Sequence, residues 1–146
     1  MNPFSDDYFM KQALTEARLA AEEGEAPVGA VIVSGDRIIA RAHNQTERLN
    51  DPTAHAEMLA ITAATGALGA KYLTECRLYV TVEPCVMCAG AIGWSQLDAV
   101  IYGASDEKRG FIKYAPQALH AKTIVTGGIL ENDCADIMKV FFQNRR

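Results

Sequence analysis

Segments with the hydrophobic pattern of strands alternate with helical segments along most of this sequence. Two Val- and Ile-rich strands come first, within residues 26–44, and Ser-Gly-Asp-Arg at residues 34–37 supplies the turn between them. Further strands are predicted at residues 76–82, 98–104 and 122–128, and helices at residues 6–24, 54–69, 84–97 and 130–146. Gly66 is expected to break the helix within residues 54–69. Strands that alternate with helices favour a largely parallel sheet, but the first pair must be antiparallel. The sequence therefore predicts an α/β fold in which a mixed five-stranded sheet carries helices on both faces.

Length and composition are those of an ordinary globular protein. The 146 residues are expected to form a single domain, residues 1–146, with 49% apolar and 22% charged residues. No apolar run approaches the roughly 20 residues that span a bilayer, and the acidic start lacks the features of a secretory signal. We therefore expect a cytoplasmic protein with no membrane partner. A formal net charge of −4 does not by itself indicate a nucleic-acid-binding protein, although basic residues gather in the last forty positions.

Two of the four cysteines have the spacing of metal ligands. Cys85 and Cys88 follow Pro84 at the start of a predicted helix, where positions three apart share a face. The free N–H groups and positive dipole end of a helix start stabilise thiolates, which are good zinc ligands. By itself such a pair is also typical of a structural zinc site or a redox pair. Cys76 and Cys134 have no such spacing and are expected to be small buried residues.

His55 and Glu57 complete the pattern. His55 lies at the start of another helix that follows a strand, so it can approach the cysteines as a third zinc ligand. The sequence offers no convincing fourth ligand, and three ligands with one open position are typical of catalytic zinc. Glu57 cannot share the helical face of His55, but it can flank the metal and transfer protons.

The motif His-Ala-Glu followed by Pro-Cys-Val-Met-Cys resembles the signature of zinc-dependent nucleoside and nucleobase deaminases. More specifically, residues 24–33, 43–58, 78–92, 100–110 and 141–146 resemble the tRNA-specific adenosine deaminases of bacteria. This resemblance covers nearly the whole chain. It implies a three-layer cytidine-deaminase-like fold, a homodimer, and conversion of adenosine to inosine at the wobble position of a tRNA anticodon.

The same resemblance implies roles for particular residues. His55, Cys85 and Cys88 would bind one Zn²⁺ per subunit, Glu57 would transfer protons, and Asn44 would hydrogen-bond the base. Backbone N–H groups near residues 82–83 and at the cysteine helix could help to fix the attacking oxygen.

Three residues are expected to reach the rest of the RNA. Asp106 matches a family position near the neighbouring ribose, although a capping role at the start of a loop is an alternative. Phe142 and Arg145, with Phe141 and Arg146, could supply stacking surface and phosphate contacts. Alternatively the phenylalanines pack the last helix onto the sheet, and at least one of them is expected in the core.

Two other functions share part of this pattern. A free-base deaminase acting on guanine or a related purine would use identical zinc chemistry. Trp94 and the segment 111–122 depart from the pattern expected for the tRNA enzymes. A zinc-stabilised RNA-binding protein without catalysis is a third interpretation, but it gives no purpose to Glu57 and would require a fourth ligand.

Overall fold

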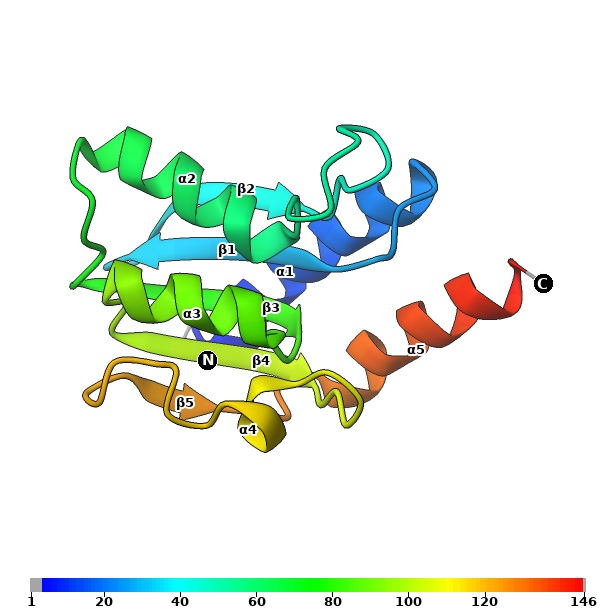
Figure 1. The fold of residues 1–146 in the computed structure, drawn as a ribbon. Coiled ribbons are helices and arrows are strands. Elements are labelled where there is room, and N and C mark those ends of the chain that lie inside the picture. The colour runs from blue at the N-terminus through cyan, green and yellow to red at the C-terminus, as the bar shows by residue number, and fades with distance from the viewer. Residues whose placement is uncertain (1–3, 146) are drawn as a thin grey trace.

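In the computed structural model, which describes residues 4–145, a five-stranded sheet lies between two layers of helices (Figure 1). The strands are β1 Gly29–Ser34, β2 Arg37–His43, β3 Cys76–Val82, β4 Ala99–Ala104 and β5 Ile124–Thr126. The helices are α1 Asp6–Glu22, α2 Ala56–Leu68, α3 Val86–Ser95, α4 Phe111–Tyr114 and α5 Glu131–Gln143. Within the described range, no helix combines the length and the apolar character needed to cross a membrane.

The strand order is β2-β1-β3-β4-β5, and the sheet is mixed as the sequence predicts. β1 pairs antiparallel with both β2 and β3, whereas β3, β4 and β5 are parallel to one another. All strands except β1 therefore run in one direction, and their carboxyl ends lie at one edge of the sheet. Loops that follow β2, β3 and β4 meet at this edge, which is where ligands bind in open α/β sheets.

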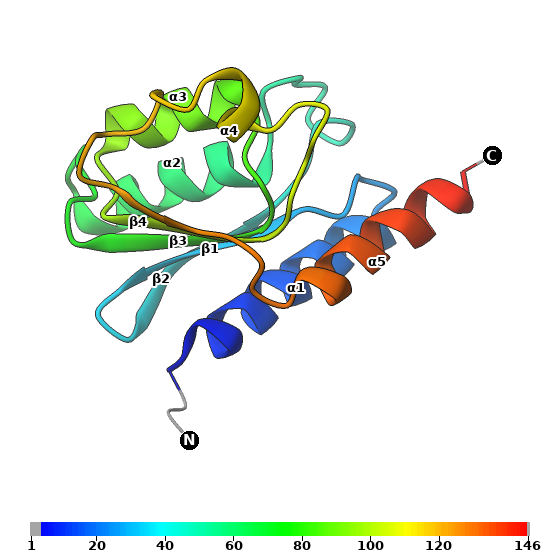
Figure 2. The same ribbon diagram turned by 90° about the horizontal axis from the view of Figure 1, so that it is seen from below.

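Each face of the sheet has its own core. α2 and α3 cover one face, and α1 and α5 lie on the other (Figure 2). In β1, Ala30 and Ile32 pack against the first pair of helices, while Val31 and Val33 face the second. Because alternate residues of a strand point to opposite faces, a strand covered on both sides is apolar throughout. The three-layer arrangement is confirmed.

The predicted end of α2 is wrong. Gly66 was expected to break this helix, but it lies inside α2, which continues to Leu68. Gly69 ends the helix instead, with φ +64° and ψ +31° in the left-handed region. A glycine in a helix interior costs only about 1 kcal/mol, whereas the left-handed position after a helix favours glycine strongly.

The last helix leaves the sheet. Cys134 in its first turn is buried against β4, as expected for a small buried cysteine, but the helix then runs past the sheet beside α1 (Figure 2). Phe141 is therefore only half-buried and Phe142 is 52% exposed, so the expectation of a core phenylalanine is wrong. Arg146 lies outside the described residues.

Candidate active site

Two helices begin next to each other at the carboxyl edge of the sheet. His55 is the N-cap of α2 and Cys85 is the N-cap of α3, and both have extended backbone conformations before the first helical turn. β2 leads to His55 through the 44–54 loop, whereas β3 leads to Cys85 within three residues. Residues thirty positions apart in the sequence thus meet because their two strands end at the same edge.

The three expected ligand atoms converge on one point. His55 Nδ1 lies 3.6 Å from Cys85 Sγ and 3.5 Å from Cys88 Sγ, and all three atoms lie within 4.8 Å of one another. With Zn–S about 2.3 Å and Zn–N about 2.0–2.1 Å, a tetrahedral ion holds its ligand atoms roughly 3.5–3.8 Å apart. The described residues that cluster here therefore fit Zn²⁺ with three protein ligands. The geometry is that of a site with one coordination position left for another ligand.

The electrostatics of the two thiols differ. A hydrogen bond from Cys88 and the nearby His55 ring lower the pKa of Cys85 to about 4, against the opposing effect of burial. The same bond to Cys85 and nearly complete burial raise the pKa of Cys88 above its usual range. Contact with Cys85 in turn raises the pKa of His55. The cluster thus holds a thiolate readily, which is the form that binds metals.

Glu57 lies in the first turn of α2 with only 4% of its surface exposed. Burial raises the pKa of its carboxyl to about 7. It borders the same pocket as His55 and Cys85. A carboxyl group whose pKa lies near neutrality can both accept and return a proton there, which is the requirement for general acid–base chemistry.

Asn44 follows β2 and faces the same pocket, with 8% of its surface exposed. Among the described residues, its Oδ1 is the one buried side-chain oxygen or nitrogen without a hydrogen-bond partner. Buried polar atoms are nearly always paired, because an unpaired one costs roughly 1–3 kcal/mol. The side chain is therefore positioned to bind a ligand, and apolar walls from Val28, Val82 and Met138 surround it.

Asp106 follows β4 and lies between this pocket and a neighbouring groove. Its Oδ1 accepts hydrogen bonds from the N–H groups of Lys108 and Arg109, both at 3.1 Å. The capping role considered for this aspartate is confirmed, and its position at the pocket also leaves it near any bound ligand. Its backbone N–H donates to Glu83, which the sequence did not single out.

Backbone N–H groups near residues 82–83 are not all free. The N–H of Glu83 donates to the carbonyl oxygen of Ala104 at 2.8 Å. The expectation that it helps to fix an attacking oxygen is therefore wrong, because the pairing of β3 with β4 continues by one residue. The first turn of α3 begins at Val86, and the backbone N–H of Cys88 in this turn contributes to lowering the pKa of Cys85.

The C-terminal residues lie farther from the ligand cluster. Phe142 lines the groove that Asp106 shares with the pocket. Arg145 donates a hydrogen bond from Nη2 to the carbonyl oxygen of Gly24 at 2.6 Å, and its guanidinium lies 4.4 Å from the centre of the Phe141 ring. Phosphate binding by Arg145 stays a prediction, and the guanidinium has further N–H donors besides the one bonded to Gly24.

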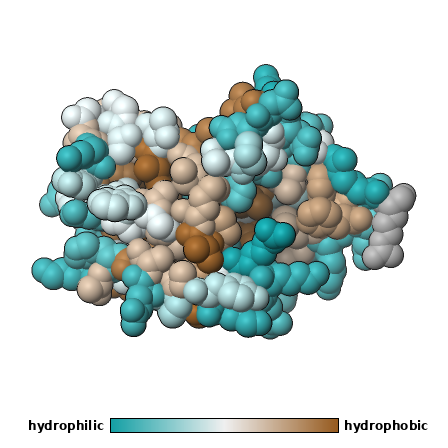
Figure 3. All heavy atoms as spheres, viewed as in Figure 1, coloured by the Kyte–Doolittle hydropathy of each residue, from teal (hydrophilic) through white to brown (hydrophobic). Residues whose placement is uncertain are grey.

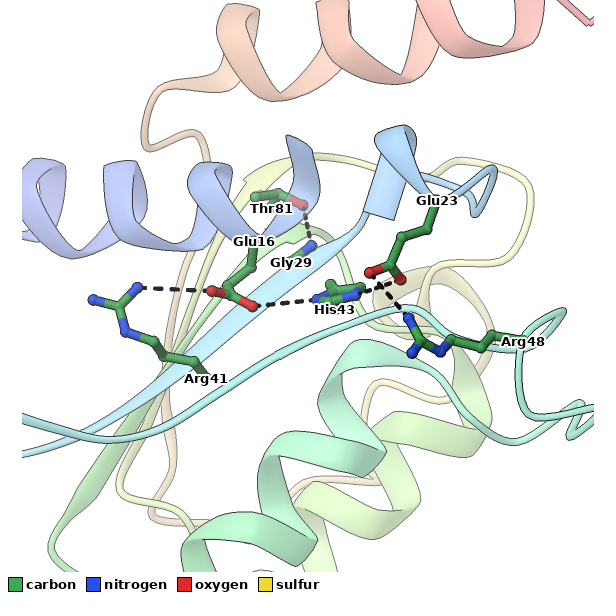
Figure 4. Close-up of polar contacts among 7 residues, drawn as sticks. All are labelled: Glu16, Glu23, Gly29, Arg41, His43, Arg48 and Thr81. Carbon is green, nitrogen blue, oxygen red and sulfur yellow. Dashed lines mark hydrogen bonds and ion pairs between the residues drawn. The ribbon is translucent and has the colours of Figure 1, made fainter. Parts of the chain in front are cut away.

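Sequence reasoning did not find the charge network behind the pocket. The ring of His43 lies between a carboxylate of α1 and that of the residue after α1, 3.3 Å from Glu16 Oε1 and 3.0 Å from Glu23 Oε1 (Figure 4). Arg41 and Arg48 pair with the other oxygens of these carboxylates, at 3.8 and 3.3 Å. The network joins α1 to the end of β2, directly before the asparagine of the pocket. The spacing of residues along the sequence does not predict such contacts, because the partners come from separate elements.

Two buried carboxylates hold the loops at the pocket. Glu25, which is 1% exposed, accepts hydrogen bonds from the N–H groups of Glu47 and Arg48 at 3.1 and 2.7 Å, and so fixes the loop before His55. Glu83 does the same for the loop after β4. In the sequence they look like ordinary surface acids.

Comparison with known proteins agrees with this geometry. Residues 4–104 match the family model for the cytidine and deoxycytidylate deaminase zinc-binding region. A tRNA-specific adenosine deaminase of Agrobacterium fabrum is 43% identical over 144 residues, which cover 95% of each chain. A solved structure from a study of A-to-I editing by tRNA:A34 deaminases has a TM-score of 0.84 and 45% identity, covering 89% of this chain and 98% of that one. The solved guanine deaminase of Bacillus subtilis has a TM-score of 0.67 and 46% identity, covering 69% of this chain and 65% of that one.

Proposed function

This chain belongs to the cytidine and deoxycytidylate deaminase family and, within it, to the tRNA-specific adenosine deaminases, and on that basis we propose that it converts adenosine to inosine at the wobble position of a tRNA anticodon. The observation that carries the proposal is the convergence of three ligand atoms, a buried acid and an unpaired amide in one pocket. A hydrolase of this kind uses water as its second substrate and releases ammonia.

His55, Cys85 and Cys88 would hold one Zn²⁺ per subunit. When bound, zinc supplies Lewis acidity that polarises a water molecule at its open position. The two thiolates neutralise the charge of the ion, so the water is less acidified than beside three neutral imidazoles. A nearby base is correspondingly more useful, and Glu57 is the buried acid in this position.

Glu57 is the proton carrier in this proposal. It takes a proton from the water whose oxygen adds to C6 of adenine and gives that proton to N1. A second transfer through the same carboxyl group moves the proton of the hydroxyl group added at C6 to the amino group. The C6–N bond then breaks, ammonia leaves and C6 becomes a carbonyl carbon. The raised pKa of Glu57, about 7, supports both directions of transfer near neutral pH.

Asn44 would hold the base, and three other residues would meet the flanking nucleotides. The unpaired Oδ1 of Asn44 can accept a hydrogen bond from the base, and its amide can donate one. Asp106 and Phe142 share a groove beside the pocket, which supports ribose contact by the first and stacking by the second. Arg145 would contact a phosphate with the N–H groups that do not bond Gly24.

We place residues 1–146 in one zinc-dependent deaminase domain that works as a homodimer in the cytoplasm, where its tRNA substrate is found. Apolar side chains reach the surface over α3 in the view of Figure 3. Trp94 on α3 is 84% exposed, and Val86 at the other end of α3 and Ile112 and Tyr114 on the neighbouring α4 are also exposed. Exposed apolar patches of this kind mark interaction sites. A purely monomeric species in analytical ultracentrifugation at micromolar concentration would contradict the dimer.

The decisive experiment compares substrates. Zinc-loaded protein is incubated with an anticodon stem-loop that carries adenosine at the wobble position, and separately with guanine, adenine and cytosine. We expect inosine and ammonia from the stem-loop only. The same stem-loop with guanosine at the wobble position serves as the control for ammonia from other sources.

Guanine is the strongest competing substrate. A guanine deaminase shares the fold at 46% identity over the matched region, and the metal chemistry would be the same. Ammonia from guanine together with an unchanged stem-loop would replace the tRNA proposal by the free-base one. RNA binding without any ammonia would support the third interpretation, a non-catalytic protein stabilised by zinc.

A further inference from the structure

One buried carboxylate at the candidate active site takes no part in the chemistry proposed above. Glu83 directly follows β3 and precedes Pro84 and Cys85, and 7% of its surface is exposed. Its Oε1 accepts a hydrogen bond from the N–H of Asp106 at 3.0 Å, and its Oε2 accepts one from the N–H of Ile112 at 3.1 Å. One side chain thus ties both ends of the segment 106–112 to the strand that leads to the ligand cysteines.

The backbone around Glu83 is built for this contact. Gly110 forms an isolated antiparallel bridge with Cys85, and the N–H of Phe111 donates to the carbonyl oxygen of Pro84 at 2.9 Å. A Cβ atom at Gly110 would overlap Glu83 Oε2 and the carbonyl oxygen of Asp106. Glycine at this position is therefore what lets the carboxylate reach both N–H groups.

The segment that Glu83 holds carries side chains to the pocket. Asp106 and Arg109 line the pocket that contains Asn44 and Glu57. Arg109 also borders, with Lys108, Tyr114 and His55, a second groove on the other side of the ligand cluster. A nucleic acid strand whose base enters the pocket must pass this segment. Its placement therefore affects the binding of the nucleotides next to that base.

We infer that Glu83 is a positioning residue for RNA binding: it fixes the segment 106–112 so that Asp106 and Arg109 meet the nucleotides that flank the deaminated base. The inference rests on the proposed function for the identity of the ligand. Glu83 borders the pocket, but each of its carboxylate oxygens already accepts a backbone N–H, from Asp106 and from Ile112. It acts through the two backbone N–H groups.

Glu83→Gln tests the contact with little change of shape. A glutamine amide has one accepting oxygen and one donating NH2 group. Its oxygen can accept from one of the two backbone N–H groups, but its NH2 group then faces the other N–H, and two donors form no hydrogen bond. Gly110→Ala disturbs the same contact from the other side, because the added methyl group displaces the Glu83 carboxylate and also the carbonyl oxygen of Asp106. Glu107→Gln is the matched control, since Glu107 lies in the same segment with its side chain exposed.

The measurements are kcat and KM for the zinc-loaded protein with the anticodon stem-loop, zinc content, and hydrogen exchange of the segment 106–112. In Glu83→Gln and Gly110→Ala we expect KM to rise about tenfold or more while kcat and zinc content stay within about threefold, because one buried N–H loses its partner. The amides of Asp106 and Ile112 should lose protection from exchange while the sheet keeps its protection. Glu107→Gln should match the wild type in every measurement.

Two results would overturn the inference. An unchanged KM in a variant whose segment has lost protection would show that RNA binding does not depend on its placement. A joint loss of kcat, zinc and protection across the sheet would show that Glu83 supports the whole fold instead. A wild-type protein that leaves the stem-loop unchanged would contradict the proposed function, and the exchange data would still decide whether Glu83 fixes the segment.

Discussion

Asn44 is the residue whose unpaired buried side chain supports its proposed role in binding the base. Its buried Oδ1 lacks a partner among the described residues, and the free protein bears the cost of that unpaired atom. A bound base would supply the missing partner. In the proposed function, the cost of the unpaired atom in the free protein is offset when the base binds.

Asn44→Ala should separate recognition from stability. We expect kcat/KM for the stem-loop to fall about 10–100-fold, since one or two hydrogen bonds to the base are lost. The free energy of unfolding should not fall below that of the wild type, because an unpaired buried atom is removed. Asn132→Ala, at an exposed position of α5, is the control for the substitution itself. Full activity in Asn44→Ala would exclude the asparagine from base binding.

Glu57→Gln should separate metal binding from chemistry. The glutamine keeps the shape of the side chain but cannot carry protons, so turnover should fall by at least about 10²–10⁴-fold. Zinc content, measured by elemental analysis, should equal that of the wild type, because Glu57 is not one of the three clustered ligands. Turnover at the wild-type rate in Glu57→Gln would contradict the proposed role of Glu57 in proton transfer.

At the scale of elements, the glycine inside α2 and the glycine that ends it have opposite effects on the stability of the fold. Gly66 lies in the helix with open space where a Cβ would be, so Gly66→Ala should raise the free energy of unfolding by about 0.5–1 kcal/mol. Gly69 has φ +64°, so Gly69→Ala should lower it by about 1 kcal/mol. Urea denaturation of both variants measures the two changes. Equal effects of the two substitutions would contradict this assignment of the helix end.

The elements differ in how far they could be predicted from sequence. The hairpin and the starts of the cysteine and histidine helices follow from local signals, such as Gly35 in the turn and Pro84 before Cys85, and the structure confirms them. The end of α2 could not be predicted because a helical pattern tolerates Gly66. The exposure of Phe142 could not be predicted because it depends on where α5 leaves the sheet, which is a tertiary property. Contacts such as those of Glu83 were missed for the same reason.

At the scale of the whole molecule, the ligand cluster joins two separate strand–helix units. His55 belongs to the unit of β2 and α2, and the cysteines belong to the unit of β3 and α3. Zinc bound there would connect the two helix starts. Because the unfolded chain has no preformed site, metal binding contributes directly to the stability of the fold.

Removal of zinc should therefore destabilise the protein. A strong chelator is expected to lower the midpoint temperature of unfolding by about 10 °C. This is the shift expected when a lost ligand had stabilised the folded state by about 4 kcal/mol. Cys88→Ser should be destabilised already and should respond little to the chelator. Cys134→Ala changes a buried cysteine away from the cluster, so it should keep the full chelator response. A chelator response in Cys88→Ser as large as in the wild type would contradict the ligand assignment.

The proposed metal-binding and proton-transfer residues lie on different elements from the residues proposed to contact the rest of the substrate, and this has an evolutionary consequence. His55, Glu57 and Cys88 lie at or near helix starts anchored to the central sheet, whereas Asp106, Arg109 and Phe142 belong to a loop and to a helix that projects from the sheet. Mutation can remodel the second group without moving the first. A lineage with this scaffold could thus exchange one nucleobase-containing substrate for another while its reaction stays the same.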